Sequence, residues 1–211
     1  MRRSRLWALV FSLTAVAALC RVTPAAAQLS DPAIGAPAPT FTLPDTYGNQ
    51  HALGDYRGQW VVLEWLNYGC PYVQKHYKSQ NMQDLQAKYR EDGVAWLAIV
   101  SSAPGKQGYY PADEMNVQNE AHNNKASAVL LDPEGDVGKA YGARTTPQMV
   151  VIDPRGTLLY NGAIDDRPTA RLADIDGAHN YLVAALDEAM AGRAVSVPRT
   201  QPYGCSVKYK K

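Results

Sequence analysis

The chain of 211 residues has little net charge, only three cysteines and, beyond its first part, no long apolar run. Its 21 basic and 20 acidic residues nearly balance, which gives no electrostatic reason to expect binding to nucleic acid or to an anionic membrane surface. After residue 27, no apolar stretch approaches the roughly 20 residues that a membrane-spanning helix needs. The sequence also lacks repeats and low-complexity tracts. These absences point to a globular protein of single-domain length.

The one long apolar segment lies at the N-terminus and has the layout of a secretory signal peptide. Arginines precede the apolar run 6–19, and Pro24 and three alanines follow it. We expect cleavage after Ala27, which removes residues 1–27 and exports the protein to the periplasm or the medium. Bulky Leu19 before Cys20 disfavours a lipid anchor. Because the removed part holds four arginines and no acid, the mature chain keeps 17 basic and 20 acidic residues. We expect no stable membrane insertion of this mature chain.

Cysteine is scarce, and the mature chain keeps only Cys70 and Cys205. Paired thiols oxidise in exported compartments, so two interpretations arise. A structural disulfide would attach the tail to the domain. Alternatively, Cys205 would resolve an oxidised Cys70 and then be reduced again. The setting of the two cysteines favours the second, but both interpretations stay open.

Cys70 follows a buried carboxylate and opens a helix. The run 60–66 is too apolar for a surface edge and predicts a buried strand, so Glu64 is a charge where charges rarely lie without a partner or a role. Pro71 suits the first position of a helix, which places Cys70 at the positive end of the helix dipole. This setting favours thiolate over thiol. Cys70 is therefore predicted to be a nucleophile, and Glu64, with a pKa raised by burial, a group that moves its proton.

Strands and helices alternate along the chain, which predicts an α/β fold with a central sheet covered by helices. We expect one domain over residues 28–196 and an extended C-terminal tail over 197–211 that carries Cys205 and looks linker-like from Val197 to Pro202. Strands are expected at 41–43, 60–66, 94–100, 128–131, 150–152 and 157–160, the last two as an antiparallel hairpin. Helices are expected at 71–90, with a kink or break near 79–81, at 112–124 and at 179–191.

Several segments resemble the peroxiredoxin-like redoxins (AhpC/TSA type) of the thioredoxin superfamily. The resemblance runs from about Ile34 to the C-terminus and is carried by Cys-Pro-Tyr-Val at 70–73, Tyr-Asn-Gly-Ala-Ile-Asp-Asp at 160–166 and Gly-Cys-Ser-Val-Lys at 204–208. It implies a thioredoxin-like fold with a mixed central sheet and no cofactor. It also implies that Cys70 is the nucleophile, Glu64 the buried acid and Cys205 the tail cysteine. Thr146 and Pro147 match the threonine and cis-proline that face the nucleophile and pair with substrate backbone.

Three departures from the related families bear on the chemistry. Val73 stands where thioredoxins have their second cysteine, which excludes a Cys-x-x-Cys mechanism. Leu63 and Asn67 stand where peroxiredoxins have proline and threonine, and Pro147 stands at their arginine position. Asn67 is therefore a candidate donor to a reacting oxygen, against a simple turn role. Arg144 is a candidate substrate contact, against a solvent-exposed position.

These residues predict an exported thiol oxidoreductase whose substrate is a hydroperoxide or a disulfide, recycled by a protein or small-molecule thiol. The first alternative is a disulfide reductase without peroxidase activity. The second is a non-catalytic module or a copper-binding one, with Cys70, Cys205, His122 and His179 as the available soft ligands, although no local metal motif supports this. His76 is expected to face solvent because it lies on a different helical face from Cys70. Three tryptophans are expected in the core, namely Trp60, Trp65 and Trp96.

Overall fold

The computed structural model describes residues 31–210, and the predicted signal peptide over 1–27 lies outside the described residues. Five strands form the central sheet, in the order β5-β4-β3-β7-β8. Strands β3, β4 and β5 run parallel, whereas β7 is antiparallel to both β3 and β8. The predicted α/β class with a mixed sheet is confirmed. The strands of this sheet are β3 (Val61–Trp65), β4 (Ala95–Val100), β5 (Ala128–Leu131), β7 (Met149–Ile152) and β8 (Leu158–Gly162).

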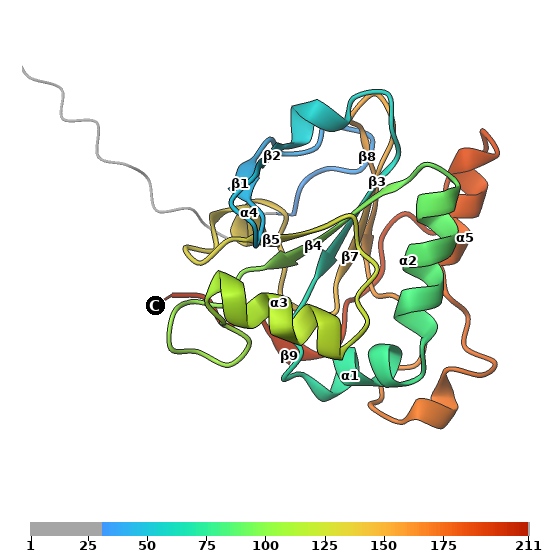
Figure 1. The fold of residues 1–211 in the computed structure, drawn as a ribbon. Coiled ribbons are helices and arrows are strands. Elements are labelled where there is room, and N and C mark those ends of the chain that lie inside the picture. The colour runs from blue at the N-terminus through green and yellow to red at the C-terminus, as the bar shows by residue number, and fades with distance from the viewer. Residues whose placement is uncertain (1–30, 211) are drawn as a thin grey trace, which may run out of the picture.

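Helices cover one face of this sheet (Figure 1). The break predicted near 79–81 is confirmed: the helical segment 71–90 forms two helices, because Gln80 has φ +64 and ends the first helical run. Val62 of β3 and Leu66, which directly follows the strand, pack in the same core as these helices. The elements on this face are α1 (Pro71–Lys78), α2 (Asn81–Glu91), α3 (Ala112–Ala121) and α5 (Tyr181–Met190). The hydroxyl of Tyr89 on α2 donates to the carboxylate of Asp187 on α5, which ties two of them together.

The opposite face carries a second core, in which Leu63 and Trp65 of β3 pack against the N-terminal segment and a short helix. The sequence analysis had not predicted that helix. The elements on this side are the hairpin β1 (Thr42–Pro44) and β2 (Gln50–Ala52), the 3-10 helix η1 (Leu53–Tyr56) and α4 (Asp136–Ala140). A further 3-10 turn, η2 (Leu172–Asp174), interrupts the loop after β8. Trp65 and Trp96 are fully buried as expected, and Trp60 packs against the first core.

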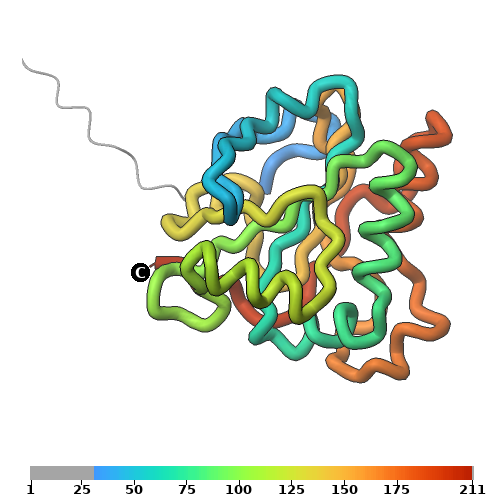
Figure 2. The backbone as a smooth tube through the Cα atoms, in the orientation of Figure 1, coloured from blue at the N-terminus to red at the C-terminus, as the bar shows by residue number. Residues whose placement is uncertain are grey.

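The tail is not a linker. It forms β9 (Cys205–Ser206), which pairs antiparallel with β6 (Thr145–Thr146) in a separate two-stranded sheet. Beyond β9, the amide of Ala103 donates to the carbonyl of Lys208, so the tail runs beside the loop that follows β4 (Figure 2). Backbone hydrogen bonds therefore hold this C-terminal segment against the domain. Within residues 31–210, no helix has the length and apolar character to cross a membrane.

Candidate active site

Cys70 is the N-cap residue of α1, and the loop before it is shaped by Asn67. The backbone carbonyl of Asn67 accepts the Cys70 amide at 2.9 Å, and its side-chain oxygen accepts the Gly69 amide at 2.9 Å. Pro71 is the first residue of the helix, where its missing N–H costs no helical bond. The chain therefore turns sharply from β3 into α1 and leaves Cys70 at the positive end of the helix dipole.

The sulfur of Cys70 is enclosed by the loop at Thr146. Cys70 is fully buried, and its thiol donates to the carbonyl oxygen of Thr146 at 3.1 Å. The Thr146–Pro147 bond is cis, as the resemblance predicted. The hydroxyl of Thr146 is buried and has no hydrogen-bond partner among the described residues, yet it is placed to favour the Cys70 thiolate. A donor without a partner beside a sulfur is available to the anion once the thiol loses its proton.

The tail brings the second cysteine to the same sulfur. Cys205 is the register partner of Thr146 in the β6–β9 pair, and its amide donates to the sulfur of Cys70 at 3.4 Å. Both cysteines are free thiols, and the side chain of Cys205 lies close enough to Cys70 to affect the acidity of its thiol. Gly204 allows this approach: it has φ +134, and a Cβ there would lie 2.0 Å from the carbonyl oxygen of Thr146. Two cysteines that are 135 residues apart in the sequence therefore meet directly.

The surroundings give the two thiols different acidities. Burial opposes ionisation of the Cys70 thiol, but the nearby donor groups of Cys205 and Thr146 favour the thiolate, and their combined effect lowers the pKa of Cys70. Burial and the neighbouring Cys70 sulfur raise the pKa of Cys205 to about 11. Cys70 is consequently the more acidic thiol of the pair, and Cys205 keeps its proton to higher pH.

Glu64 lies in β3 and is fully buried. Its carboxylate accepts three hydrogen bonds: from the Tyr77 hydroxyl at 3.0 Å, the Gln86 amide at 3.0 Å and the Trp96 indole at 2.8 Å. Burial raises the pKa of Glu64 in spite of these donors. The sequence marked Glu64 as a buried acid, but not the three side chains from α1, α2 and β4 that hold it.

Two candidate residues have other partners. The Asn67 amide nitrogen donates weakly to the Gln107 carbonyl at 3.5 Å, and its oxygen is taken by Gly69, so its side chain serves the turn. The guanidinium of Arg144 forms a two-pronged pair with Asp31 at 2.7 and 2.9 Å and is partly exposed. Among the described residues, the structure thus brings Thr146, Pro147 and Cys205 to Cys70, while Asn67 and Arg144 direct their polar groups elsewhere.

The potential copper ligands do not converge. His122 stacks on Tyr68 with ring centroids 4.1 Å apart, and His179 is an exposed residue before α5 that contacts Tyr181. Over residues 31–210, no group of three or more His, Cys, Asp or Glu side chains is arranged to hold a metal ion. Only Cys70 and Cys205 of the four candidate ligands are neighbours.

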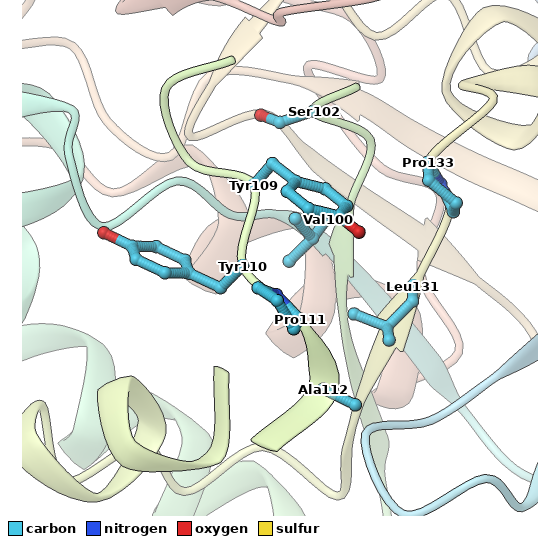
Figure 3. A pocket seen from close by; sticks show the side chains of 8 residues that line it. All are labelled: Val100, Ser102, Tyr109, Tyr110, Pro111, Ala112, Leu131 and Pro133. Atoms are coloured by element: carbon cyan, nitrogen blue, oxygen red, sulfur yellow. The ribbon is translucent and has the colours of Figure 1, made fainter. Parts of the chain in front are cut away.

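A small cavity lies in the loop after β4, beside the active-site turn (Figure 3). Its volume is about 80 Å³, and Val100, Leu131, Tyr109 and Tyr110 are among the residues that line it. Figure 3 shows the two tyrosine rings pointing in opposite directions from the loop. Gln107 of the same loop donates to the Gly69 carbonyl at 2.9 Å, which fixes the loop against the turn. The cavity is far below the roughly 300–1,000 Å³ typical of a small-molecule site, so it does not serve as one.

The expectation that His76 faces solvent is wrong. Lys75 and His76 of α1 are both buried, and they surround Asp165, which follows β8. The ammonium of Lys75 lies 3.2 Å from one carboxylate oxygen of Asp165, and the hydroxyl of Tyr203 in the tail donates to the other. Helical spacing alone predicts that this face of α1 is exposed to solvent. In the structure, the tail and the loop after β8 cover it, so the spacing missed this cluster. The only signal was Asp165 within the segment 160–166 that resembles the redoxins.

Comparisons with known proteins place this geometry in a family. The model of the AhpC/TSA family matches residues 34–161, more than half of the chain. The chain belongs to the AhpC/TSA family. A thiol-disulfide oxidoreductase named ResA from Geobacillus thermodenitrificans is 30% identical over 125 residues, which are 59% of this chain and 66% of that protein. The chain thus matches slightly less than two thirds of this relative's length.

Solved structures agree on the fold. A hypothetical protein of Sinorhizobium meliloti has a TM-score of 0.73 and 25% identity, and the match covers 88% of this chain and 99% of that one. The thioredoxin domain of a thiol-disulfide oxidoreductase from Bacteroides vulgatus has a TM-score of 0.51 and 18% identity, over 69% of this chain and 97% of that one. The AhpC/TSA member described here therefore has a thioredoxin-like fold, as its sequence predicted.

Proposed function

We propose that this protein is a thiol–disulfide oxidoreductase in which Cys70 attacks the substrate and Cys205 resolves the product. One observation carries the proposal: the Cys205 amide and thiol both lie at the Cys70 sulfur, across the β6–β9 pair and beside cis-Pro147. A merely structural disulfide would not need a nucleophile with a lowered pKa and a partner whose pKa is raised to about 11. The likeness to a protein named thiol-disulfide oxidoreductase supports the same activity.

The exchange would proceed in two displacements. The Cys70 thiolate attacks one sulfur of a substrate disulfide, the substrate S–S bond breaks, and the first substrate thiol leaves with a proton. The thiolate of Cys205 then attacks the Cys70 sulfur of the mixed disulfide and releases the second substrate thiol, also with a proton. The substrate gains two electrons, and the protein is left with a Cys70–Cys205 disulfide. An external thiol, from a protein or a small molecule, must return two electrons to begin a new cycle.

Glu64 is proposed to accept and return a proton during this exchange. Its full burial raises the pKa of Glu64, which suits a carboxyl group that can hold a proton and return it. The side chain reaches the α1 helix through the Tyr77 hydroxyl, one of its three donors. Glu64→Gln is expected to slow release of the disulfide and to shift its pH dependence, and an unchanged pH profile would leave Glu64 a structural role.

Hydroperoxide reduction is the second candidate, favoured by membership of the AhpC/TSA family. Here the Cys70 thiolate would attack the terminal peroxide oxygen, the O–O bond would break, and the alcohol or water would leave. Cys205 would then attack the sulfenic acid sulfur, form the disulfide and release water. Arg144 and Asn67 direct their polar groups to Asp31 and to the turn. A slow reaction with peroxide is therefore expected.

Export to the periplasm or the medium is part of the proposal and rests on the signal-like pattern of the N-terminal residues. The two-thiol chemistry suits such a compartment, where disulfides form and persist. Fusing residues 1–27 to a reporter that is active only outside the cytoplasm would test it, with the charge-reversed Arg2→Glu, Arg3→Glu and Arg5→Glu triple variant as the control.

The first experiment is intact mass measurement with thiol counting on the reduced protein. One portion receives one equivalent of a small disulfide and another one equivalent of hydrogen peroxide. Rapid loss of two thiols with the small disulfide, and a Cys70–Cys205 link, supports the proposal. Comparable loss with peroxide supports the second candidate, and a Cys70 that alkylates no faster than a model thiol points to a non-catalytic module.

Cys70→Ser should abolish turnover, whereas Cys205→Ser should let oxidised Cys70 accumulate. Equal, mild effects of both substitutions would contradict the mechanism.

A further inference from the structure

The buried cluster around Asp165 joins the helix of Cys70 to the tail of Cys205. Lys75 lies on α1, five residues after Cys70, and its side chain is fully buried. Its ammonium contacts Asp165 at 3.2 Å and donates to the Arg167 carbonyl at 2.8 Å. The Tyr203 hydroxyl donates to the remaining carboxylate oxygen of Asp165. Tyr203 thus adds a hydrogen bond to a charge pair that is buried between α1 and the loop after β8.

The position of Tyr203 in the chain makes this contact consequential. It precedes Gly204 and Cys205 directly, so the hydroxyl bond to Asp165 lies two residues from the resolving thiol. The Tyr203 ring packs edge-on against Tyr72 at 5.8 Å between centroids, and the Lys75 ammonium lies 5.5 Å from its centre. Both neighbours are residues of α1, whose N-terminus is Cys70. Contacts with α1 therefore fix the position of the segment that carries Cys205, and Cys70 lies at the start of the same helix.

A second contact holds the other end of the tail. The ring of Tyr209 lies against Gly135 and Gly138, where a Cβ would meet its atoms at 2.4 Å in each case, and its hydroxyl donates to the Ala143 carbonyl at 2.6 Å. Between the two tyrosines, β9 places the amide of Cys205 3.4 Å from the Cys70 sulfur, and Tyr203 and Cys205 pack against the core that contains Cys70. Cys70 is fully buried, so a substrate from solution reaches it only after part of the covering chain moves.

We propose that Tyr203 is a positioning residue that latches the tail over Cys70 through Asp165 and Lys75, and that opening of this latch admits the external reactants. The inference rests on the proposed function. The latched state favours formation of the Cys70–Cys205 disulfide, because it holds the two sulfurs together. The same state protects Cys70 from solution thiols and disulfides. The two effects have opposite signs when the latch is weakened, and a control substitution of a similar hydrogen bond elsewhere separates them from a loss of overall stability.

The test is Tyr203→Phe, which removes the hydroxyl and keeps the ring. Its matched control is Tyr89→Phe, which removes a hydroxyl bond to the carboxylate of Asp187 at 2.8 Å, remote from the tail. Redox equilibration with glutathione gives the effective concentration of Cys205 at Cys70. We expect Tyr203→Phe to lower it by about tenfold or more, the effect of losing a hydrogen bond to a charged group. In a Cys205→Ser background, the same substitution should make Cys70 react faster with iodoacetamide.

The control Tyr89→Phe should leave both the effective concentration of Cys205 and the alkylation rate of Cys70 unchanged. If Tyr203→Phe also leaves both unchanged, or moves both in the same direction, the latch is refuted while the proposed function stands. If the unsubstituted protein forms no Cys70–Cys205 disulfide with any oxidant, the proposed function itself has failed.

A measurement on the unsubstituted protein covers the case in which Tyr203→Phe does not fold. The amide of Val207 donates to the Arg144 carbonyl, and its hydrogen exchange reports opening of the tail. We expect it to exchange by a local opening, at least a hundredfold faster than the central amides of β7 (Met149–Ile152). Exchange of Val207 only at the rate of these β7 amides would overturn the latch, because the tail would then open only when the whole domain unfolds.

Discussion

Cys205 lies opposite Thr146 in the β6–β9 pair, so the tail thiol is in register with the residue whose carbonyl accepts the hydrogen bond of the Cys70 thiol. This single pairing brings together the nucleophile, the cis-proline loop and the second cysteine. It depends on how closely the tail can approach the loop. The residue that sets this distance is Gly204, whose missing side chain leaves room for the Thr146 carbonyl.

Gly204→Ala should therefore lift β9 from β6. Its Cβ would lie 2.0 Å from the Thr146 oxygen, a backbone atom that cannot turn aside, and φ +134 is unfavourable for alanine. We expect a loss of about 1–3 kcal/mol in unfolding free energy and slower formation of the Cys70–Cys205 disulfide, measured by urea titration and thiol counting. Gly192→Ala is the control, because Gly192 has φ +73 but nothing within 4 Å of a Cβ. Equal rates of disulfide formation in the two variants would show that the close approach is unimportant.

The sequence predicted the strands and helices of the sheet well because their signals are local. The apolar run at 60–66 and the turn at Asp153–Gly156 each determine their own element. Cys70 and Glu64 stand out as candidates for the same reason, since a helix start and a charge in an apolar strand are visible in single segments. The docking of the tail and the cluster of Lys75, His76 and Asp165 could not be found this way. Both depend on contacts between segments far apart in the chain, and no periodicity records which polar face such a segment covers.

Thr146→Val is expected to make Cys70 less acidic. The substitution keeps the shape of the side chain and removes a buried hydroxyl that has no partner in the described residues until the thiolate forms. Loss of a donor to the anion raises the pKa of the Cys70 thiol, so the pH profile of its alkylation should move to higher pH. In a Cys205→Ser background, alkylation at pH 6 should slow by roughly tenfold. Thr145→Val, which removes a neighbouring buried hydroxyl also without a partner, should leave the profile in place. A profile shifted equally by both would point to a general effect on the loop.

Glu64 should make the unfolding free energy depend on pH. Burial raises the pKa of Glu64 in the folded protein, so the fold holds its proton at pH values where the unfolded chain has lost it. Its contribution is therefore complete below the unfolded pKa of about 4.3 and declines as pH rises through the folded pKa. Glu64→Gln should lack this decline.

Urea unfolding between pH 4 and 8, in a Cys70→Ser background that removes the thiol titration, gives the comparison. Several carboxylates, Asp45 and Asp153 among them, have lowered pKa values and make the opposite contribution, but they are common to both proteins. The difference between the two stability curves thus isolates the contribution of Glu64. Parallel curves would contradict a raised pKa of Glu64 in the folded protein.

Lys75→Met should be among the most destabilising single substitutions on α1. The side chains of Lys75 and Asp165 are 0% and 2% exposed, so removal of the ammonium leaves a buried carboxylate without its cation. Breaking such a pair costs about 3–5 kcal/mol. Lys88→Met is the matched control, because the Lys88–Asp92 pair on α2 is 55% and 48% exposed and such surface pairs contribute at most about 1 kcal/mol. The pair also contacts Tyr203 of the tail. Limited proteolysis at low urea should therefore cut the tail of Lys75→Met before it cuts the domain. An uncut tail in a destabilised domain would show that the charge pair does not keep the tail and Cys205 in place.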